Sequence, residues 1–115
     1  ALLGPALEGL HKRAQDLGLS ALVEVHAEDE LRLARWAKAS LVGVNSRNLR
    51  TLKTDLGIAR SLAKKSEGAV MIAESGLRSR AEIDELAALG YRGFLIGTTL
   101  MRQADPGAAL KGLLA

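Results

Sequence analysis

The chain has 115 residues and a formal net charge of +3, and 48% of its residues are hydrophobic but only 3% aromatic. This length suits one small domain or a piece of a larger one with an aliphatic core. The sequence has no cysteine, which excludes disulfides, and no apolar run long enough to span a membrane. The basic residues are scattered singly, which favours a solvated surface over a nucleic-acid interface. We therefore expect a cytoplasmic protein that binds neither membrane nor nucleic acid.

The N-terminal part of the sequence predicts a helix, a strand, a second helix and a second strand. The first helix lies in GPALEGLHKRAQDLGLS, with Gly18 at its end. ALVEVH, residues 21–26, is short and branched, as is typical of a strand. The helix predicted over residues 28–40 has acidic residues in its first turn, where the helix dipole favours them. The next strand, LVGVN, ends at Asn45.

A polar loop, SRNLRTLKT, then leads to a third helix and a third strand. The helix is predicted over residues 55–64, with Thr54 as its N-cap. The strand is AVMIAE, which ends on a carboxylate at Glu74. The alternation of helices and strands continues without a linker.

The last part of the sequence predicts two more helices around a fourth strand. Ser79 and Glu82 have the spacing of a capping box, at the start of a helix that ends at Leu89. GFLIG predicts the strand, and Asp105 caps a final helix, PGAALKGLLA. Strands that alternate with helices predict an α/β fold with a parallel sheet and right-handed crossovers.

Three polar residues stand at the ends of predicted strands. Parallel strands bring their carboxyl ends to one rim, where ligands bind in α/β folds. The period-two alternation of a strand places Glu24, Asn45 and Glu74 on the face opposite the helices. A glutamate that only caps its own turn is the alternative for Glu74. The matching positions of all three residues favour a binding or catalytic site.

Two small-residue pairs follow the third and fourth strands and indicate an anion site. Ser75–Gly76 and Gly97–Thr98 let a ligand approach the backbone closely. Arg78 adds a charge there, or is simply solvated. The sequence has no GxxxxGK[ST] or GxGxxG motif, and its two histidines without cysteine or HExxH predict no metal site.

Four stretches together resemble one known family. LVEVH, VGVNSRNLRTLKTDL, AESGLRSRAEI and FLIGTTLMRQADPGAAL are similar to the successive strand-end motifs of indole-3-glycerol phosphate synthase. The resemblance covers almost the whole chain. It implies that residues 1–115 are a single half-barrel unit: an N-terminal helix and then a parallel (βα)4 half of a TIM barrel, the C-terminal part of a (βα)8 domain.

The resemblance implies an enzyme of tryptophan biosynthesis. The family closes the pyrrole ring of 1-(2-carboxyphenylamino)-1-deoxyribulose 5-phosphate, a phosphorylated small molecule, with loss of carbon dioxide and water and without a cofactor. Glu24 matches the family's general base. Asn45 and Glu74 match residues that contact the substrate.

The resemblance also assigns the phosphate site. Ser75, Gly76, Gly97 and Thr98 match the phosphate cradle, with threonine at position 98 where serine is common. Arg47 matches an arginine of the family's sixth loop.

The general-acid lysine of the family lies in the half of the barrel that this sequence lacks. We therefore expect the isolated chain to be inactive, since proton donation needs an acid at the reacting atoms. Leu22, Leu41, Val70 and Ile72 would fill a closed barrel but meet water in an open sheet with two unpaired edges. We expect association with an N-terminal half-barrel or with a second copy of the chain.

Two other functions stay open from the sequence. One is a phosphate-binding half-barrel folding module without turnover. The other is a different phosphate-sugar barrel enzyme, since related barrels share the last two loops. Glu24 and the NSRNLR stretch argue against the second alternative, because general phosphate barrels do not need them.

Overall fold

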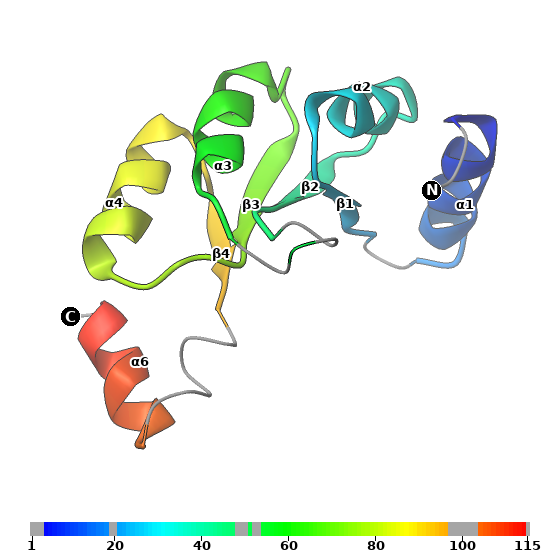
Figure 1. Ribbon diagram of the computed structural model, residues 1–115. Helices are drawn as coiled ribbons and strands as arrows, with labels where there is room; N and C mark the ends of the chain where they lie inside the picture. The colour runs from blue at the N-terminus through cyan, green and yellow to red at the C-terminus, as the bar shows by residue number, and fades with distance from the viewer. Residues whose placement is uncertain (1–3, 19–20, 48–50, 52–53, 97–103, 115) are drawn as a thin grey trace.

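The computed structural model describes residues 4–18, 21–47, 51, 54–96 and 104–114. Helices and strands alternate along the chain (Figure 1). The elements are α1 (Gly4–Asp16), β1 (Val23–Val25), α2 (Glu28–Trp36), β2 (Leu41–Asn45), α3 (Gly57–Leu62), the 3-10 turn η1 (Ala63–Lys65), β3 (Val70–Glu74), α4 (Arg80–Leu89), β4 (Gly93–Leu95) and α6 (Pro106–Leu114). None of the helices in these ranges is long and apolar enough to cross a membrane.

The four strands form one parallel sheet in the order β1-β2-β3-β4. The sequence prediction of a parallel α/β fold is therefore confirmed. The register places Asn45 opposite Glu74 and Gly43 opposite Glu24. Register partners share a face of the sheet, and so do Gly43 and Asn45, which are two positions apart on β2. All four residues therefore lie on the same face.

Helices cover the other face of the sheet. Figure 1 shows α2, α3 and α4 side by side on it, with α1 beyond β1 and α6 beyond α4. The core between the two layers is aliphatic, as the composition predicts. Its fully buried members come from both layers, and the largest are Leu31, Leu62, Met71, Leu77, Leu86, Val25, Val42 and Val44.

The face opposite the helices carries large apolar side chains that no described element covers. Leu22 keeps 41% of its surface exposed, Val70 42% and Leu95 50%. These residues project from β3, β4 and the approach to β1. The arrangement is that of a (βα)4 half-barrel whose interior face is open.

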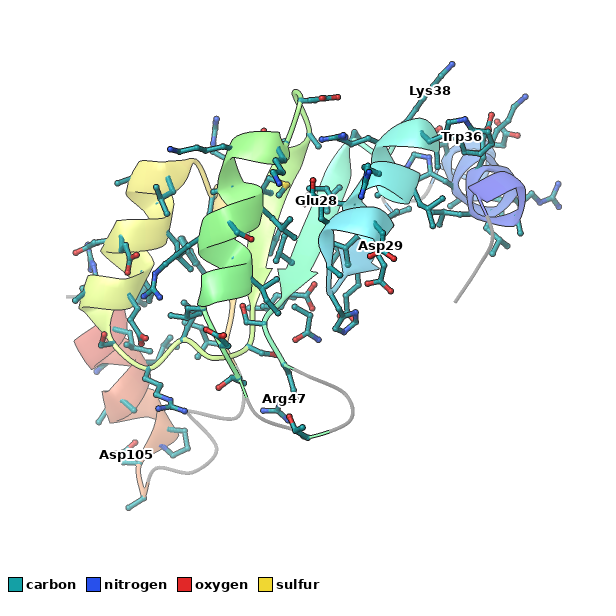
Figure 2. All side chains as sticks on the ribbon, turned by 45° about the horizontal axis from the view of Figure 1, so that its top comes forward. Glu28, Asp29, Trp36, Lys38, Arg47 and Asp105 are labelled. Carbon is teal, nitrogen blue, oxygen red and sulfur yellow. The ribbon has the colours of Figure 1, made fainter. Side chains whose placement is uncertain are left out.

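Two helix ends show how local sequence sets the boundaries. Ser79 Oγ accepts a hydrogen bond from Glu82 N at 3.3 Å, which confirms Ser79 as the N-cap of α4. The Glu82 side chain accepts from Arg78 N rather than from Ser79 N, so the reciprocal half of the predicted capping box is shifted by one residue. The helix that begins at Glu28 stops at Trp36 rather than Ser40, because Lys38 adopts a left-handed conformation with φ 61°. Figure 2 shows Glu28 and Asp29 at one end of α2, with Trp36 and Lys38 at the other.

The predicted cap of the third helix is wrong. α3 begins at Gly57 rather than Asp55, and its N-cap, Leu56, makes no side-chain hydrogen bond. Thr54 instead forms an isolated bridge with Arg47, which holds it outside the helix. Asp55 Oδ1 accepts from Gly57 N at 2.8 Å and so binds one of the free N–H groups of the first turn.

Candidate active site at the carboxyl rim of the sheet

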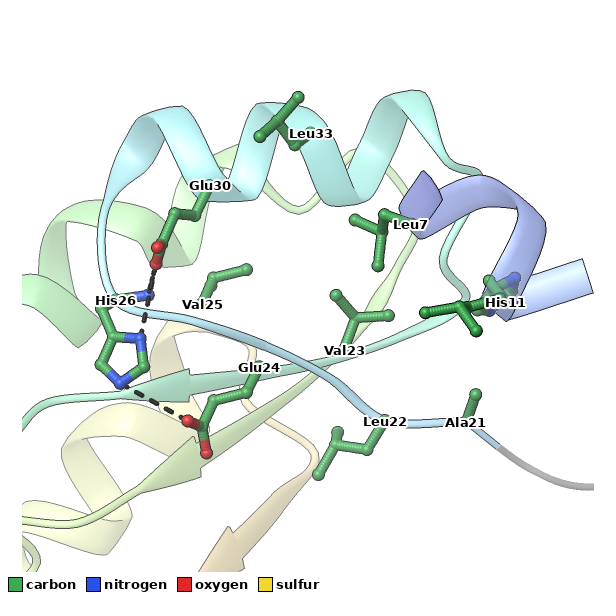
Figure 3. Close-up of a pocket in the computed structure, with 11 residues that line it drawn as sticks. Leu7, His11, Ala21, Leu22, Val23, Glu24, Val25, His26, Glu30 and Leu33 are labelled. Atoms are coloured by element: carbon green, nitrogen blue, oxygen red, sulfur yellow. Dashed lines mark hydrogen bonds and ion pairs between the residues drawn. The ribbon is translucent and has the colours of Figure 1, made fainter. Parts of the chain in front are cut away.

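The carboxyl ends of β2 and β3 are joined at the rim of the sheet. Asn45 is the register partner of Glu74, and Ser46 N donates a 3.0 Å hydrogen bond to the carbonyl oxygen of Glu74. Glu24 lies on the neighbouring strand β1. In Figure 3, Glu24 and Leu22 point away from α2, whereas Val25 points towards it. Glu24 therefore projects from the uncovered face of the sheet.

Glu74 and Glu24 meet above a glycine. Glu74 is only 8% exposed, and its carboxylate occupies the space that a Cβ at position 43 would need. Gly43 itself is the register partner of Glu24. Burial, a side-chain hydrogen bond with Glu24 and the nearby Glu24 charge together raise the pKa of Glu74 to about 7, from an ordinary value of 4.5. Glu74 can therefore hold a proton at neutral pH.

Glu24 is more accessible and contacts a histidine. Its side chain is 45% exposed, and its Oε2 lies 3.4 Å from His26 Nε2. On the other side of the imidazole, Nδ1 lies 3.4 Å from Glu30 Oε1, which also accepts a 2.6 Å hydrogen bond from His26 N (Figure 3). Glu30 belongs to α2, so the start of this helix fixes the end of β1 and the ring beside Glu24.

The loop after β2 begins with a side-chain hydrogen bond. Arg47 N donates to Asn45 Oδ1 at 2.9 Å, which orients the Asn45 amide and leaves its NH₂ group to donate elsewhere. The chain returns through the bridge between Arg47 and Thr54. Thr54 then packs against Gly76, where an added Cβ would lie 3.2 Å from Thr54 Cβ. The loops after β2 and β3 are therefore in contact.

The turn after β3 has an unusual backbone conformation. Ser75 and Gly76 are both left-handed, with φ 65° and 74°. This conformation costs a non-glycine residue free energy and is found at ligand-binding turns. Gly97 and Thr98, the other half of the predicted anion site, lie outside the described residues. Arg78 is exposed, and its backbone N–H bonds to the Glu82 side chain.

The structure brings Glu24, Asn45 and Glu74 to one rim and places Ser75 and Gly76 directly after it. Sequence reasoning did not name Gly43 or His26 among the site residues. Period-two spacing was the usable signal, since it places residue 43 on the face of Asn45 and residue 26 on the face of Glu24.

Metal binding is not indicated by this geometry. Within the ranges that the structure describes, no group of three or more His, Cys, Asp or Glu residues could hold a metal ion.

Comparison with known proteins identifies the family. A family model described as indole-3-glycerol phosphate synthase matches residues 1–113. The chain belongs to this family.

Among curated relatives, the indole-3-glycerol phosphate synthase of Carboxydothermus hydrogenoformans is 45% identical, over 95% of this chain and 42% of the relative. That of Mycolicibacterium gilvum is 44% identical, over 99% of this chain and 42% of the relative. Indole-3-glycerol phosphate synthase 1 of Streptomyces coelicolor is 41% identical, over the whole chain and 43% of the relative. The chain thus spans about two fifths of the length of these synthases.

Solved structures show likeness of fold alone. A mandelate oxidase with benzoyl-formic acid matches 98% of this chain with a TM-score of 0.68, at 17% identity and over 35% of its own length. The Amycolatopsis orientalis BexX/CysO complex contains a chain that matches 97% of this one with a TM-score of 0.63, at 20% identity and over 50% of its own length. This member of the indole-3-glycerol phosphate synthase family thus shares its half-barrel arrangement with proteins of dissimilar sequence.

Proposed function

We propose that this chain is the C-terminal part of an indole-3-glycerol phosphate synthase. The whole barrel would close the indole ring of 1-(2-carboxyphenylamino)-1-deoxyribulose 5-phosphate, with loss of carbon dioxide and water. The family match over residues 1–113 is the observation that carries the proposal. The shared rim of Glu24, Asn45 and Glu74 supports it, because a ring closure needs acid and base groups around one small molecule.

In this proposal Glu24 is the general base. Its exposed carboxylate is able to reach a substrate on the open face, and the His26 imidazole contacts this carboxylate. Asn45 donates to the substrate through its NH₂ group, because its Oδ1 already accepts from Arg47 N. Glu74 contacts the substrate in its neutral, protonated form, which its raised pKa of about 7 keeps substantially populated at neutral pH.

The phosphate would bind at the turns after β3 and β4. Ser75 and Gly76 supply backbone N–H groups and a hydroxyl, and the backbone at both is left-handed. Gly97 and Thr98 complete the cradle in the proposal, and Arg47 adds positive charge from the neighbouring loop.

The missing partner would be the N-terminal half of the barrel. The chain spans about two fifths of its relatives, the sheet has two outer strands, and its second face carries exposed Leu22, Val70 and Leu95. A cavity of about 520 Å³ runs along the free side of β1, between α1 and α2, with His26 at one end (Figure 3). A preceding strand would pair there. The general acid would then come from that half, and a second copy of the chain is the other candidate for the partner.

A hybrid enzyme tests the proposal. This chain is placed in the Carboxydothermus hydrogenoformans synthase in exchange for the segment it matches, and formation of indoleglycerol phosphate is measured. We expect activity in the hybrid, and a loss of roughly 10²-fold to 10⁴-fold on Glu24→Gln, as for removal of a general base. Glu8→Gln, an exposed change on α1, serves as the matched control. A folded hybrid without product, or one indifferent to Glu24→Gln, would refute the assignment.

A second candidate applies to the chain by itself: phosphate binding without turnover. The left-handed Ser75–Gly76 turn favours it, since this feature needs no other half of the barrel. Inorganic phosphate should then raise the melting temperature of the 115-residue chain, and Gly76→Ala should abolish the rise because alanine disfavours φ 74°. Gly112→Ala, in α6 with open space around it, is the control.

A further inference from the structure

We propose that Glu24 and Glu74 form a carboxyl pair that holds one proton between them, and that Gly43 is the positioning residue that makes room for the pair. The pair is a property of the folded chain and stands whether or not the chain takes part in the proposed reaction. A role for this carboxyl pair in catalysis rests on the proposed function.

Gly43 allows the two carboxyl groups to meet. It lies on β2, between Glu24 on β1 and Ile72 on β3 in the same row of the sheet. Glu74 Oε2 occupies the site where a Cβ of residue 43 would stand, with Glu74 Cδ 3.0 Å from that point and Leu22 Cδ1 3.3 Å from it. Any larger residue at position 43 would push the Glu74 carboxyl away from the sheet.

The surroundings of Glu74 Oε2 favour the protonated form of this carboxyl group. This atom is buried, and no donor among the described residues reaches it. A buried carboxylate oxygen without a donor is costly, and two facing carboxylates repel each other as well. A single proton removes both penalties, because a protonated Glu74 donates an O–H···O bond to Glu24, which stays ionised. The raised pKa of Glu74 agrees with this arrangement.

The other charged groups favour Glu24 as the ionised member. His26 Nε2 lies 3.4 Å from Glu24 Oε2 and supplies a donor when it carries a proton there. Glu30, from α2, contacts the far side of the same imidazole. β2 contributes no ionisable side chain to the pair, and β4 presents Leu95 opposite Glu74. Within the described part of the chain, Glu24 is the charge that acts on Glu74.

A neutral carboxyl beside an ionised one would give the site an acid and a base on adjacent strands. In the proposed reaction, Glu74 then donates a hydrogen bond at the same pH at which Glu24 accepts a proton. Gly43 makes this possible without contacting the substrate.

Carboxyl titration of the 115-residue chain tests the pair without any substrate. The side-chain carboxyl carbons of ¹³C-labelled glutamate are followed by NMR as a function of pH, and Glu74→Gln assigns the Glu74 signal. We expect Glu74 to titrate near pH 7. Glu24→Gln should lower its midpoint by at least about one pKa unit, since the repelling charge is gone and an amide N–H is able to donate to Glu74.

Gly43→Ala should lower the same midpoint, because the displaced carboxyl returns to water. Gly112→Ala in α6 is the matched control and should leave it unchanged. If Gly43→Ala does not fold, Glu24→Gln still decides, since it changes no volume at the packed position. A Glu74 midpoint near 4.5 in the unchanged chain would overturn the proposal, and so would a high midpoint that Glu24→Gln leaves in place. Synthase activity does not enter this readout, so its absence in the hybrid leaves the pair standing.

Discussion

The hydroxyl of Tyr91 donates a 2.8 Å hydrogen bond to the carbonyl oxygen of Ala59. The bond joins the start of the β4 segment to the middle of α3, 32 positions earlier, and both residues are buried. Burial raises the pKa of Tyr91 to about 12, because the phenolate would leave water for an apolar site. The hydrogen bond that links α3 to the β4 segment therefore requires a neutral Tyr91.

Alkaline titration should show this directly, since Tyr91 is the only tyrosine in the chain. Its phenolate absorbance should rise with a midpoint near pH 12 in the folded chain, and near 10 after unfolding in urea. Between these values the unfolded chain has lost the proton that the folded chain keeps. The free energy of unfolding therefore falls as the pH rises through this window.

The matched variant is Tyr91→Phe, which keeps the ring and removes the hydroxyl. It should cost about 1 kcal/mol at neutral pH, the net value of a buried hydrogen bond. It should also remove this residue's part of the alkaline loss of stability. A phenolate midpoint near 10 in the folded chain would show that the Tyr91 hydroxyl is not buried in the folded state.

The Ser79 N-cap of α4 gives a second prediction. Ser79→Ala removes the acceptor of the Glu82 N–H and should lower the free energy of unfolding by about 1 kcal/mol. Urea unfolding followed by circular dichroism measures it. Ser61→Ala is the control, because Ser61 lies exposed within α3 and its hydroxyl only bonds back to the Ile58 carbonyl. That change should be neutral or slightly stabilising, and equal losses in the two variants would contradict the capping role.

The fold was predictable from local pattern because each element carries its own signal. β2 and β3 end on Asn45 and Glu74 as predicted, since an apolar run that stops at a polar residue marks both boundaries. α3 was less predictable. Its start depends on the bridge between Arg47 and Thr54, a contact of one loop strand with another that no local pattern contains.

The candidate site, too, was predictable from the sequence only in part. Period-two spacing was enough to place Glu24 and Glu74 on one face, because strand geometry alone decides it. Spacing says nothing about how close two side chains come across a sheet. The burial of Glu74 over Gly43, and the contact of Glu24 with His26, follow from the register of three strands and the position of α2. These contacts needed the structure.

The open face of the sheet gives a third prediction, that the isolated chain binds a hydrophobic dye and associates at micromolar concentration. Val70 and Leu95 are about half exposed on that face, and full burial of such a side chain is worth roughly 1.5–3 kcal/mol. Val70→Ser and Leu95→Ser should reduce dye fluorescence and shift sedimentation towards the monomer.

Leu17→Ser is the control for this face, because Leu17 is also exposed but lies just after the end of α1 and belongs to no strand. It should leave both readouts unchanged. A chain that sediments as a monomer and binds no dye would mean that the face is not free to associate.

Glu74→Gln should stabilise the chain at high pH and leave it unchanged at low pH. In the folded chain Glu74 has a pKa of about 7, against an ordinary 4.5, so between these values the unfolded chain releases a proton that the folded chain keeps. The free energy of unfolding therefore falls as the pH rises from 4.5 through 7, and the stabilising contribution of the neutral group is complete only below 4.5. Glutamine cannot ionise, so the variant does not lose this part of the free energy of unfolding as the pH rises. At pH 8 the gain should be roughly 1–2 kcal/mol, less than the full shift implies because the neighbouring Glu24 reaches water.

Urea unfolding at pH 4 and pH 8 measures the gain. Glu8→Gln on exposed α1 is the control and should show no such difference between the two pH values. A gain of equal size at both pH values would mean that the pKa of Glu74 is not raised on folding. A gain confined to high pH would show that Glu74 is kept at the rim at a cost in stability, as is typical of functional groups.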